Sequence, residues 1–533
     1  MMKYLKVNIK KYKLISLSLV CFASLFCTTF FGPGPFGVTN YPKREVGNLS
    51  STESTSGKFE SPNLKVHMLN GMVYALDEWS TTDDNLVSGS GQLFGINRDL
   101  IADGDFNIPI DKIAIAESNT IQNAFNPLTP MILFTATVSA MCLGGDLHCF
   151  GSCPTFYITN GDSLVLMSEG FSLSSNPVWE ESDIDALYMA KPTGTDIRLR
   201  VTNEAYETHA IKRARLFALP RSSENNRVFR TSDGDFYNSK LIYPTTCFAD
   251  EGDILSEILM FDNDERYTEA DEYDLTAKEY IELSFDEIPR GDAGLVIALR
   301  QTLLSTFVYY KILDHMGSRR GYDMARLIRE KKTDSKSRKR ILEAFGGIDI
   351  QIMDEDGNWL YAGTAYEAGP IAKDVVAVKL PHINSDIIKI RLELTKGLWR
   401  IDKIALAQLE KKVEPLIIDP IRVEDKMGRA KNDILDMLID SEEYLTTIRG
   451  DQYDLIFPMP QGATSYEWFL ESKGYYLEWH REKWLEEDDP LALLEIQWFP
   501  EKALKKMTSS FKSIEGRYEE KFWNSRYEMD INK

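Results

Sequence analysis

The chain is short of positive charge. It has 61 Lys and Arg residues against 82 Asp and Glu residues, so its formal net charge is −21 at pH 7. A surface of this sign repels phosphate groups, which argues against nucleic acid as a partner and against binding to bare anionic lipid headgroups. The acidity favours solubility, or attraction to basic partners and divalent cations.

The sequence also lacks the local signatures of common catalytic and cofactor sites. It contains no His-Glu-x-x-His helix, no Gly-x-Ser-x-Gly elbow and no phosphate loop, and its six histidines are scattered. We therefore predict no catalytic residue, no metal site and no cofactor, and we expect a protein that is not an enzyme. Triads assemble in space, so a non-local active site stays an alternative.

Cysteine is scarce, with six residues in a chain of 533. Two of them, Cys21 and Cys27, lie in the N-terminal apolar segment. The other four are Cys142, Cys149, Cys153 and Cys247. Nearby thiols usually pair in an oxidising compartment, so we expect a disulfide among these four, and the sequence leaves the pairing open. Their spacing does not match the Cys-x-x-Cys pairs of a zinc site, and free buried thiols are the other alternative.

The N-terminus has the parts of an export signal. Residues 1–13 contain five lysines and no acidic residue, and the next eighteen residues are uncharged and mostly apolar. Gly32-Pro33-Gly34-Pro35 then breaks any helix. We therefore interpret residues 1–35 as a signal peptide or signal anchor rather than a buried core helix. Residues 36–62 are rich in Ser, Thr, Asn and Lys, and this composition predicts a flexible tether.

The form of the anchor stays open. Cys21 follows Val20 and Cys27 follows Phe26, whereas bacterial lipidation needs a small residue before the cysteine. The apolar stretch is also about as long as the ~18 residues that can just span a bilayer. Lipidation at Cys21 or Cys27, an uncleaved signal anchor and clean secretion are therefore alternatives. In the first two cases the body of the chain lies in the cell envelope and faces away from the cytoplasm, in the periplasm or at the cell surface.

After the tether, apolar residues at every second position predict β-strands. Asn70-Gly71 marks a hairpin in a small β module over residues 63–118. A second β module is predicted over residues 149–250. Between these modules, segment 119–148 contains an apolar run at 131–144, which we expect to be buried or, alternatively, to contact lipid.

The C-terminal half mixes strands with helices. Residues 278–415 are predicted to form a β-sandwich with a helical insertion at 303–345. The turn at 354–358 faintly resembles a calcium loop, but it lacks the closing bidentate Glu, so we interpret it as a hairpin turn. Residues 416–533 are predicted to be an aromatic-rich α/β region. The fold class is therefore mainly β with α (α+β): several β modules, one of them a sandwich, plus a C-terminal aromatic-rich helical region.

Aromatic residues are dense over residues 466–484, and core packing is their first explanation. The alternative is a ligand platform formed by Trp468, Tyr475, Tyr476 and Trp479. A hydrolase with a non-local active site could use the polar residues of the same stretch. These are Glu467, Glu471, Glu478 and His480.

Several segments resemble a family of bacterial envelope lipoproteins, typical of Bacteroidetes, that carry a Cys-Phe-Gly-Ser-Cys-Pro-Thr-x-Tyr segment. The matching stretches are Cys149 to Tyr157, Glu169 to Ser172, Thr202 to His209, Leu295 to Leu304, Asp356 to Trp359 and Ser472 to Trp479. The family has no established activity, so the resemblance implies a lipoprotein but no catalytic residues. Separately, Leu398 to Asp402 is similar to the closing strand of galactose-binding-like jelly rolls, which implies a sugar- or protein-binding sandwich over residues 278–415.

Together these patterns predict an exported, membrane-anchored, non-enzymatic protein that binds or scaffolds in the cell envelope. The expected partners are the membrane, through the N-terminal segment, and an envelope protein or a glycan. A hydrolase near residues 466–484 is one alternative. A structural subunit of a larger envelope assembly, with residues 131–144 against lipid, is another.

Overall fold

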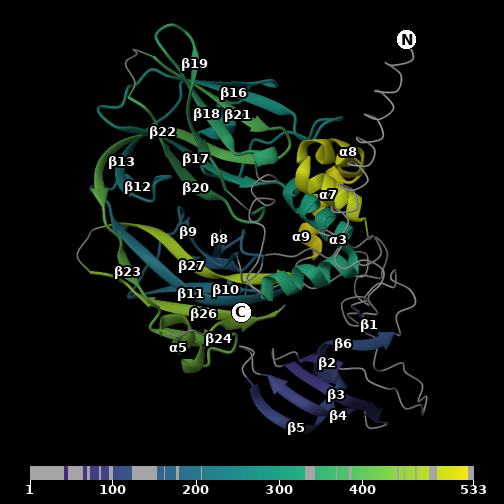
Figure 1. Ribbon diagram of the computed structural model, residues 1–533. Coiled ribbons are helices and arrows are strands. Elements are labelled where there is room, and N and C mark those ends of the chain that lie inside the picture. Colours follow the sequence, from purple (N-terminus) through teal and green to yellow (C-terminus); the bar gives the residue numbers. More distant parts are fainter. Residues whose placement is uncertain are drawn as a thin grey trace, which may run out of the picture.

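The computed structural model describes residues 41–45, 64–68, 73–82, 86–94, 100–122, 153–160, 163–175, 179–205, 207–329, 343–367, 369–382, 387–440, 443–448, 450–461, 465–478 and 489–525. Over these residues the chain is mainly β with a few helices, which confirms the predicted fold class (Figure 1). The predicted signal segment and the apolar run at 131–144 lie outside the described residues, and both stay predictions.

The N-terminal strands form one antiparallel sheet in the order β1-β6-β2-β3-β4-β5. The strands are β1 (Tyr41–Glu45), β2 (Leu64–Met68), β3 (Val73–Thr82), β4 (Leu86–Phe94), β5 (Leu100–Pro109) and β6 (Ile113–Gln122), with the 3-10 turn η1 (Ile110–Lys112) before β6. β2 pairs with β3 on either side of Asn70-Gly71, so the hairpin is confirmed. The tether prediction is wrong at β1, because pairing with β6 satisfies a backbone that composition alone marks as flexible.

The other four sheets stack as four successive layers. The first layer has the order β24 (Arg422–Asp425), β26 (Gln452–Pro458), β10 (Asp196–Thr202), β7 (Thr155–Asn160), β8 (Ser163–Glu169). The second layer has the order β23 (Leu416–Ile418), β11 (Glu207–Pro220), β27 (Tyr466–Glu478), β9 (Glu181–Ala186), and β25 (Leu445–Thr447) also pairs with β11.

The third layer has the order β12 (Arg227–Arg230), β13 (Phe236–Ile242), β22 (Trp399–Val413), β17 (Ala293–Gln301), β20 (Asp374–Lys379). The fourth layer has the order β15 (Gly252–Asp253), β14 (Thr246–Ala249), β16 (Lys278–Phe285), β21 (Ile388–Thr395), β18 (Ile348–Met353), β19 (Trp359–Ala365). The 3-10 turn η3 (Leu255–Ile258) follows β15.

These four layers stack face to face through three hydrophobic cores (Figure 1). In β27, Trp468 and Leu470 pack into the core shared by the first and second layers, while Phe469 packs into the core shared by the second and third. In β17, Val296 faces the second layer and Leu295 faces the fourth. The two central layers are therefore apolar on both faces, whereas β16 in the fourth layer alternates between buried and exposed residues, as its sequence predicts.

The predicted module boundaries near residues 250 and 415 do not separate the sheets. Strands from both sides of each boundary pair in the same layer: β10 with β26, β11 with β27, and β13 with β22. The prediction was wrong at these points because periodicity along the chain shows where strands are, but not which distant strands they pair with.

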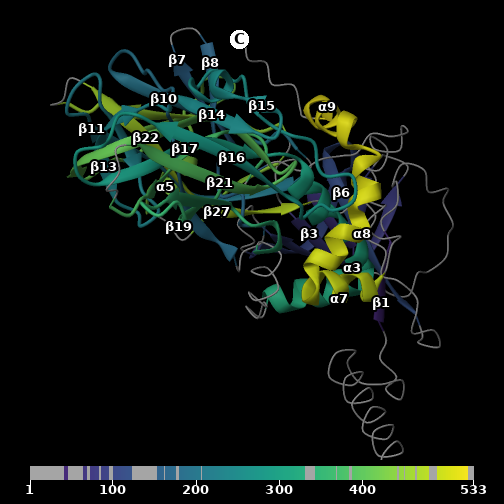
Figure 2. The ribbon, with the colours of Figure 1, turned by 90° about the horizontal axis from the view of Figure 1, so that it is seen from above.

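The helices gather at one side of the stacked layers, as both views show (Figures 1 and 2). They are α3 (Leu304–Arg329), α7 (Pro490–Trp498), α8 (Pro500–Lys512) and α9 (Glu515–Ser525), while α5 (Asn432–Asp440) contacts β11 and β24. Helix α3 begins at Leu304, and the helical insertion was predicted over residues 303–345. Phe307 packs against Phe511 and Tyr518, which joins α3 to the C-terminal helices. Within the described residues, no helix combines the length and the apolar character needed to cross a membrane.

Candidate functional site

The predicted aromatic platform does not form where its rings are described. Trp468 is 4% exposed and Tyr476 is 8% exposed, so neither offers an open ring face to a ligand. Both point from β27 into the core between the first and second layers. Tyr475 is half-buried and lies edge-on to Tyr444, and Trp479 lies outside the described residues. The platform prediction is wrong for the two buried rings, because β27 is an inner strand of a layer covered on both faces.

The carboxylates of the same stretch have structural partners. Glu467 is 2% exposed and accepts two hydrogen bonds of 2.6 Å from the Arg227 guanidinium. A second guanidinium, that of Arg221, lies 3.3 Å from the same carboxylate. Glu471 accepts a hydrogen bond from Ser182 at 3.2 Å, and His480 lies outside the described residues. Glu467 and Glu471 therefore hold strands together.

Two of the four candidate disulfide cysteines are described, and both are free, buried thiols. Burial raises the pKa of Cys247 to about 12 and also raises the pKa of Cys153, where the charges of Glu169 and Glu207 add to the effect. A thiol in such surroundings is a poor nucleophile. The other two candidates, Cys142 and Cys149, and the candidate lipidation sites, Cys21 and Cys27, lie outside the described residues, so their chemistry stays a prediction.

Four of the segments that resemble the envelope lipoproteins meet at one end of the first two layers. The Gly170 amide donates to the Pro154 carbonyl at 2.9 Å, and the Tyr476 hydroxyl donates to the Ser172 carbonyl at 3.2 Å. Close by, the fully buried His209 ring lies 2.6 Å from the Glu207 carboxylate. The contacts of Gly170 and Ser172 fix the chain that follows β8, and this chain forms one wall of a cavity.

A cavity of about 320 Å³ lies where edge strands of three layers meet. Its walls come from β9 at the edge of the second layer, β20 at the edge of the third and β19 at the edge of the fourth. The chain at 171–173 and the end of β12 complete it. Edge strands turn one row of backbone groups away from their own sheet, so a cavity bounded by three of them is a place where a ligand can find hydrogen bonds.

Glu181, Asp183, Glu367 and Asp374 line this cavity, and the buried Asp185 lies close enough to Asp183, Glu367 and Asp374 to interact with their charges. Burial raises the pKa of Asp183 to about 6, and the neighbouring charge of Asp374 adds to the effect. Burial also raises the pKa of Asp185, and the nearby charges of Asp183, Asp374 and Glu367 raise it further. The Asp185 side chain accepts a hydrogen bond from the Ser168 hydroxyl. Burial raises the pKa of Asp374 as well, although its side chain accepts the Ala186 amide at 2.7 Å. Close carboxylates in a poorly hydrated site resist ionising together.

One wall of the cavity has an unusual backbone. Phe171 is fully buried and has a φ of +38°, in the left-handed region that non-glycine residues rarely adopt. Its amide hydrogen-bonds to the Asp183 side chain, and the surrounding polar contacts hold the neighbouring Ser172. Backbone strain of this kind persists only where the surroundings impose it, and it is concentrated at functional sites.

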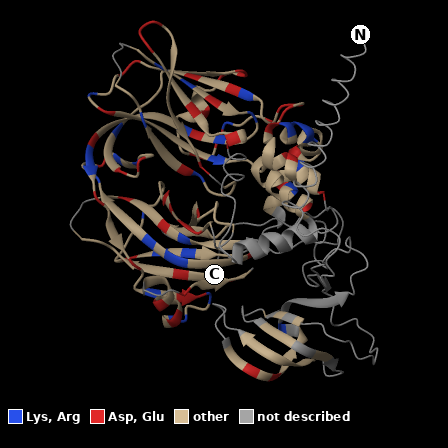
Figure 3. Ribbon diagram, in the orientation of Figure 1, with Lys and Arg blue, Asp and Glu red and all other residues tan. Residues whose placement is uncertain are grey.

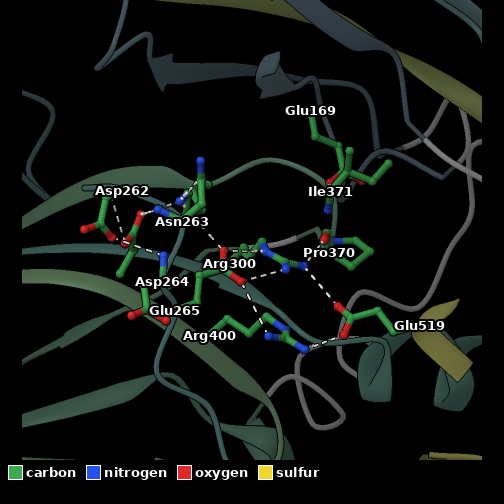
Figure 4. A network of polar contacts seen from close by, with 12 residues as sticks. Glu169, Asp262, Asn263, Asp264, Glu265, Arg300, Pro370, Ile371, Arg400 and Glu519 are labelled. Carbon is green, nitrogen blue, oxygen red and sulfur yellow. Dashed lines mark hydrogen bonds and ion pairs between the residues drawn. The ribbon is translucent and has the colours of Figure 1, made fainter. Parts of the chain in front are cut away.

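An ion-pair network supports the cavity from the side of the C-terminal helices (Figure 4). Arg300 of β17 donates to the Glu265 carboxylate at 2.7 and 2.8 Å and to the Pro370 carbonyl at 2.6 Å. Glu519 of α9 pairs with Arg300 at 3.4 Å. On the far side, the Ile371 amide donates to Glu169 at 2.8 Å. The network therefore fixes the chain just before β20 and so positions Asp374.

The cavity was not predicted from the sequence. Asp183 and Asp185 alternate around Ile184 in β9, which places both carboxylates on one face of the strand, and this pattern was the available signal. Glu367 and Asp374 come from a different layer, and no local pattern connects them to β9. Within the described part of the chain, no group of three or more His, Cys, Asp or Glu side chains could hold a metal ion.

Comparison with known proteins gives no family for this arrangement. No protein-family model matches the chain, and no curated protein matches it.

Proposed function

We propose that the chain is an exported, membrane-anchored, non-enzymatic protein that binds a partner in the cell envelope. Its placement rests on the basic and apolar residues 1–35. The binding role rests on one observation, the cavity between the three edge strands. At about 320 Å³ the cavity is at the small end of ligand sites, so it suits a small molecule or one group of a larger protein or glycan.

The mixture of charges on the stacked layers favours recognition at a local site over a broad contact with a polyanion or a bilayer. Lys and Arg are interspersed with Asp and Glu along the strands of the stacked layers (Figure 3). No single-sign field therefore dominates the strands, and specificity falls to local sites such as the cavity.

The binding role can be tested by blocking the cavity. Ser232 lies on its lining and is exposed, so Ser232→Trp places a large ring at the mouth, while Ser509→Trp on α8 adds the same ring far from it. We expect crosslinking in intact envelopes to capture a protein or glycan with the wild type and with Ser509→Trp, and not with Ser232→Trp. Equal capture by all three proteins would contradict the cavity as the binding site.

The placement has its own test. A C-terminally tagged chain should fractionate with membranes and be open to protease from outside the cytoplasm. Cys21→Ala and Cys27→Ala variants distinguish the anchors, because only lipidation at one of these residues makes membrane association depend on it. A tagged chain found in the cytosol with an intact N-terminus would contradict export.

A hydrolase is the second candidate function, and it is favoured by the raised pKa of Asp183 on the cavity wall. A carboxyl group with a pKa of about 6 in a cavity can serve as a general acid or base near neutral pH. Among the described residues 466–478, this site touches the predicted aromatic stretch only through Phe469. A panel of chromogenic glycosides and esters tests it: turnover that disappears in Asp183→Asn would support a hydrolase, and the absence of turnover would count against it.

A further inference from the structure

A lysine and an aspartate form a buried contact in the third layer. Lys373, just before β20, donates a hydrogen bond from Nζ to the Asp402 carboxylate of β22. The Lys373 side chain is 8% exposed and that of Asp402 is fully buried. By contrast, the pair of Lys379 with Asp233 lies at the surface, with side chains that are 35% and 50% exposed. Water therefore has little access to the contact between Lys373 and Asp402.

A loop between η3 and β16 holds both groups of this contact (Figure 4). The Asp262 amide donates to Asp402 Oδ1 and the Asn263 amide donates to Asp402 Oδ2, both at 3.3 Å. The Asn263 side-chain oxygen accepts a hydrogen bond from Lys373 Nζ at 2.5 Å. Asn263 has a φ of +74°, in the left-handed region, and this conformation directs two successive amides at one carboxylate. The loop therefore fixes the carboxylate and the amine against each other.

The other neighbours of Lys373 exclude water and leave Asp402 as its counter-charge. The centre of the Phe261 ring lies 4.4 Å from Nζ. Glu265 lies 3.9 Å from Nζ, but Arg300 already donates to its carboxylate at 2.7 and 2.8 Å. Separated charges are costly away from water, so a proton shift from the ammonium to the Asp402 carboxylate, which leaves two neutral groups, costs less than in water. This shift makes Nζ a nucleophile.

We propose that Lys373 and Asp402 condense into an intramolecular isopeptide bond. Nζ passes one proton to Asp402 Oδ2 and then attacks Cγ of the resulting acid, so that an Nζ–Cγ bond forms. Asp402 Oδ1 carries the negative charge of the tetrahedral intermediate, and the Asp262 amide stabilises it. The nitrogen then gives a second proton to Oδ2, the Cγ–Oδ2 bond breaks, and one water leaves. The reaction is a condensation, with no change of oxidation state.

The fold supplies the proximity that this reaction requires. Well-oriented groups held in one molecule react as if each were present at about 10⁵ M or more. The bond joins residues that are 29 apart in sequence, and it ties the edge strand β20 to β22 across β17. Because Lys373 directly precedes Asp374, the bond also anchors one wall of the cavity. It forms during folding and does not depend on what the cavity binds.

Two variants with the same amino-acid composition test this proposal. Lys373→Arg keeps the positive charge, but a guanidinium stays protonated in proteins and does not attack a carboxyl group. Lys379→Arg makes the same replacement in the exposed pair with Asp233. The two chains have equal sequence masses, and any N-terminal processing is common to both. We expect the denatured Lys379→Arg chain to be lighter than the Lys373→Arg chain by one molecule of water. Equal masses would overturn the proposal and leave the pair as an ordinary buried ion pair.

Peptide mapping of the wild-type full chain locates the bond. Trypsin cleaves an unlinked chain after Lys373, after Lys379 and after Arg400. In the linked chain, residues 341–379 stay joined to residues 401–403, because the Lys373 side chain is an amide that trypsin does not recognise. We expect this branched peptide to replace the two linear ones in most molecules. A wild-type digest that contains only the linear peptides would overturn the proposal, even if Lys373→Arg fails to fold.

Discussion

Asp183 connects the cavity to the stability of the protein. Its pKa is raised from 3.8 to about 6, so the folded chain holds a proton that the unfolded chain releases between these pH values. Stability from this group is therefore full below about pH 4, falls as the pH rises towards 6, and stays at the lower level above that. The cavity is kept at a cost to stability, as is common at functional sites.

This cost gives a prediction for Asp183→Asn, which resembles the protonated side chain at every pH. We expect the free energy of unfolding to rise by about 2 kcal/mol at pH 7.5, because each pKa unit corresponds to about 1.4 kcal/mol and the coupled Asp185 and Asp374 absorb part of the change. Chemical denaturation at several pH values measures it. The variant and the wild type should converge below about pH 4, and a constant difference across pH would refute the explanation.

Glu467 is a different kind of acidic residue, because it is buried and pairs with two arginines. Glu467→Ala leaves the partly buried Arg227 and Arg221 without their shared carboxylate, and we expect a loss of about 3 kcal/mol. The matched control is Glu287→Ala, whose pair with Lys240 is 2.8 Å long but more than half exposed on both sides. Denaturant titration should show a loss below about 1 kcal/mol for the control. Similar losses in both variants would contradict this distinction.

Strand β27 contributes side chains to two of the three cores, the one between the first and second layers and the one between the second and third. A glycine in this strand allows its close pairing with β11. A Cβ atom at Gly474 would overlap the Ala210 carbonyl oxygen, next to the register shift between Ile211 and Arg213. We expect Gly474→Ala to lower the thermal midpoint by several degrees, because the two backbones must separate.

Gly516 in α9 is the matched control. A Cβ atom there meets nothing within 4 Å, and alanine is the better helix former by about 1 kcal/mol. Gly516→Ala should therefore raise the thermal midpoint slightly. A scan in which both substitutions shift the midpoint in the same direction would contradict the packing argument for β27.

The elements differ in how far their own residues define them. β16 and β18 alternate cleanly between buried and other positions, and the sequence predicted both. The run 466–478 gave an incomplete signal, because a strand buried on both faces loses its alternation. Core packing was the first explanation of its aromatic residues, with a ligand platform as the alternative. Only the packing of β27 between two cores decided between these explanations.

On the scale of the whole molecule, the stack of four layers makes distant segments depend on one another. Residues 149–250 were predicted to form a module, but their strands pair with β22, β26 and β27. We expect this segment expressed alone to give an NMR spectrum with poor dispersion, since its apolar faces would have no cover.

Residues 36–122 are the control for this fragment experiment. They contain the whole N-terminal sheet, whose core of Leu64, Val66 and Leu76 draws on no strand of the stacked layers. This fragment should therefore fold alone, with circular dichroism typical of β-structure. A well-dispersed spectrum from residues 149–250 would show that the layers are less interdependent than the strand pairing implies.

The sequence by itself determined the mainly β fold class, the hairpin at Asn70-Gly71 and the hairpin turn at 354–358, because these depend on side-chain alternation and turn residues that are neighbours in the chain. Only the tertiary structure decided which strands share a layer, that Trp468 and Tyr476 are core residues, and that Asp183 and Asp374 face one cavity. These features arise from pairing and packing between segments far apart in sequence, and local periodicity carries no information about that choice.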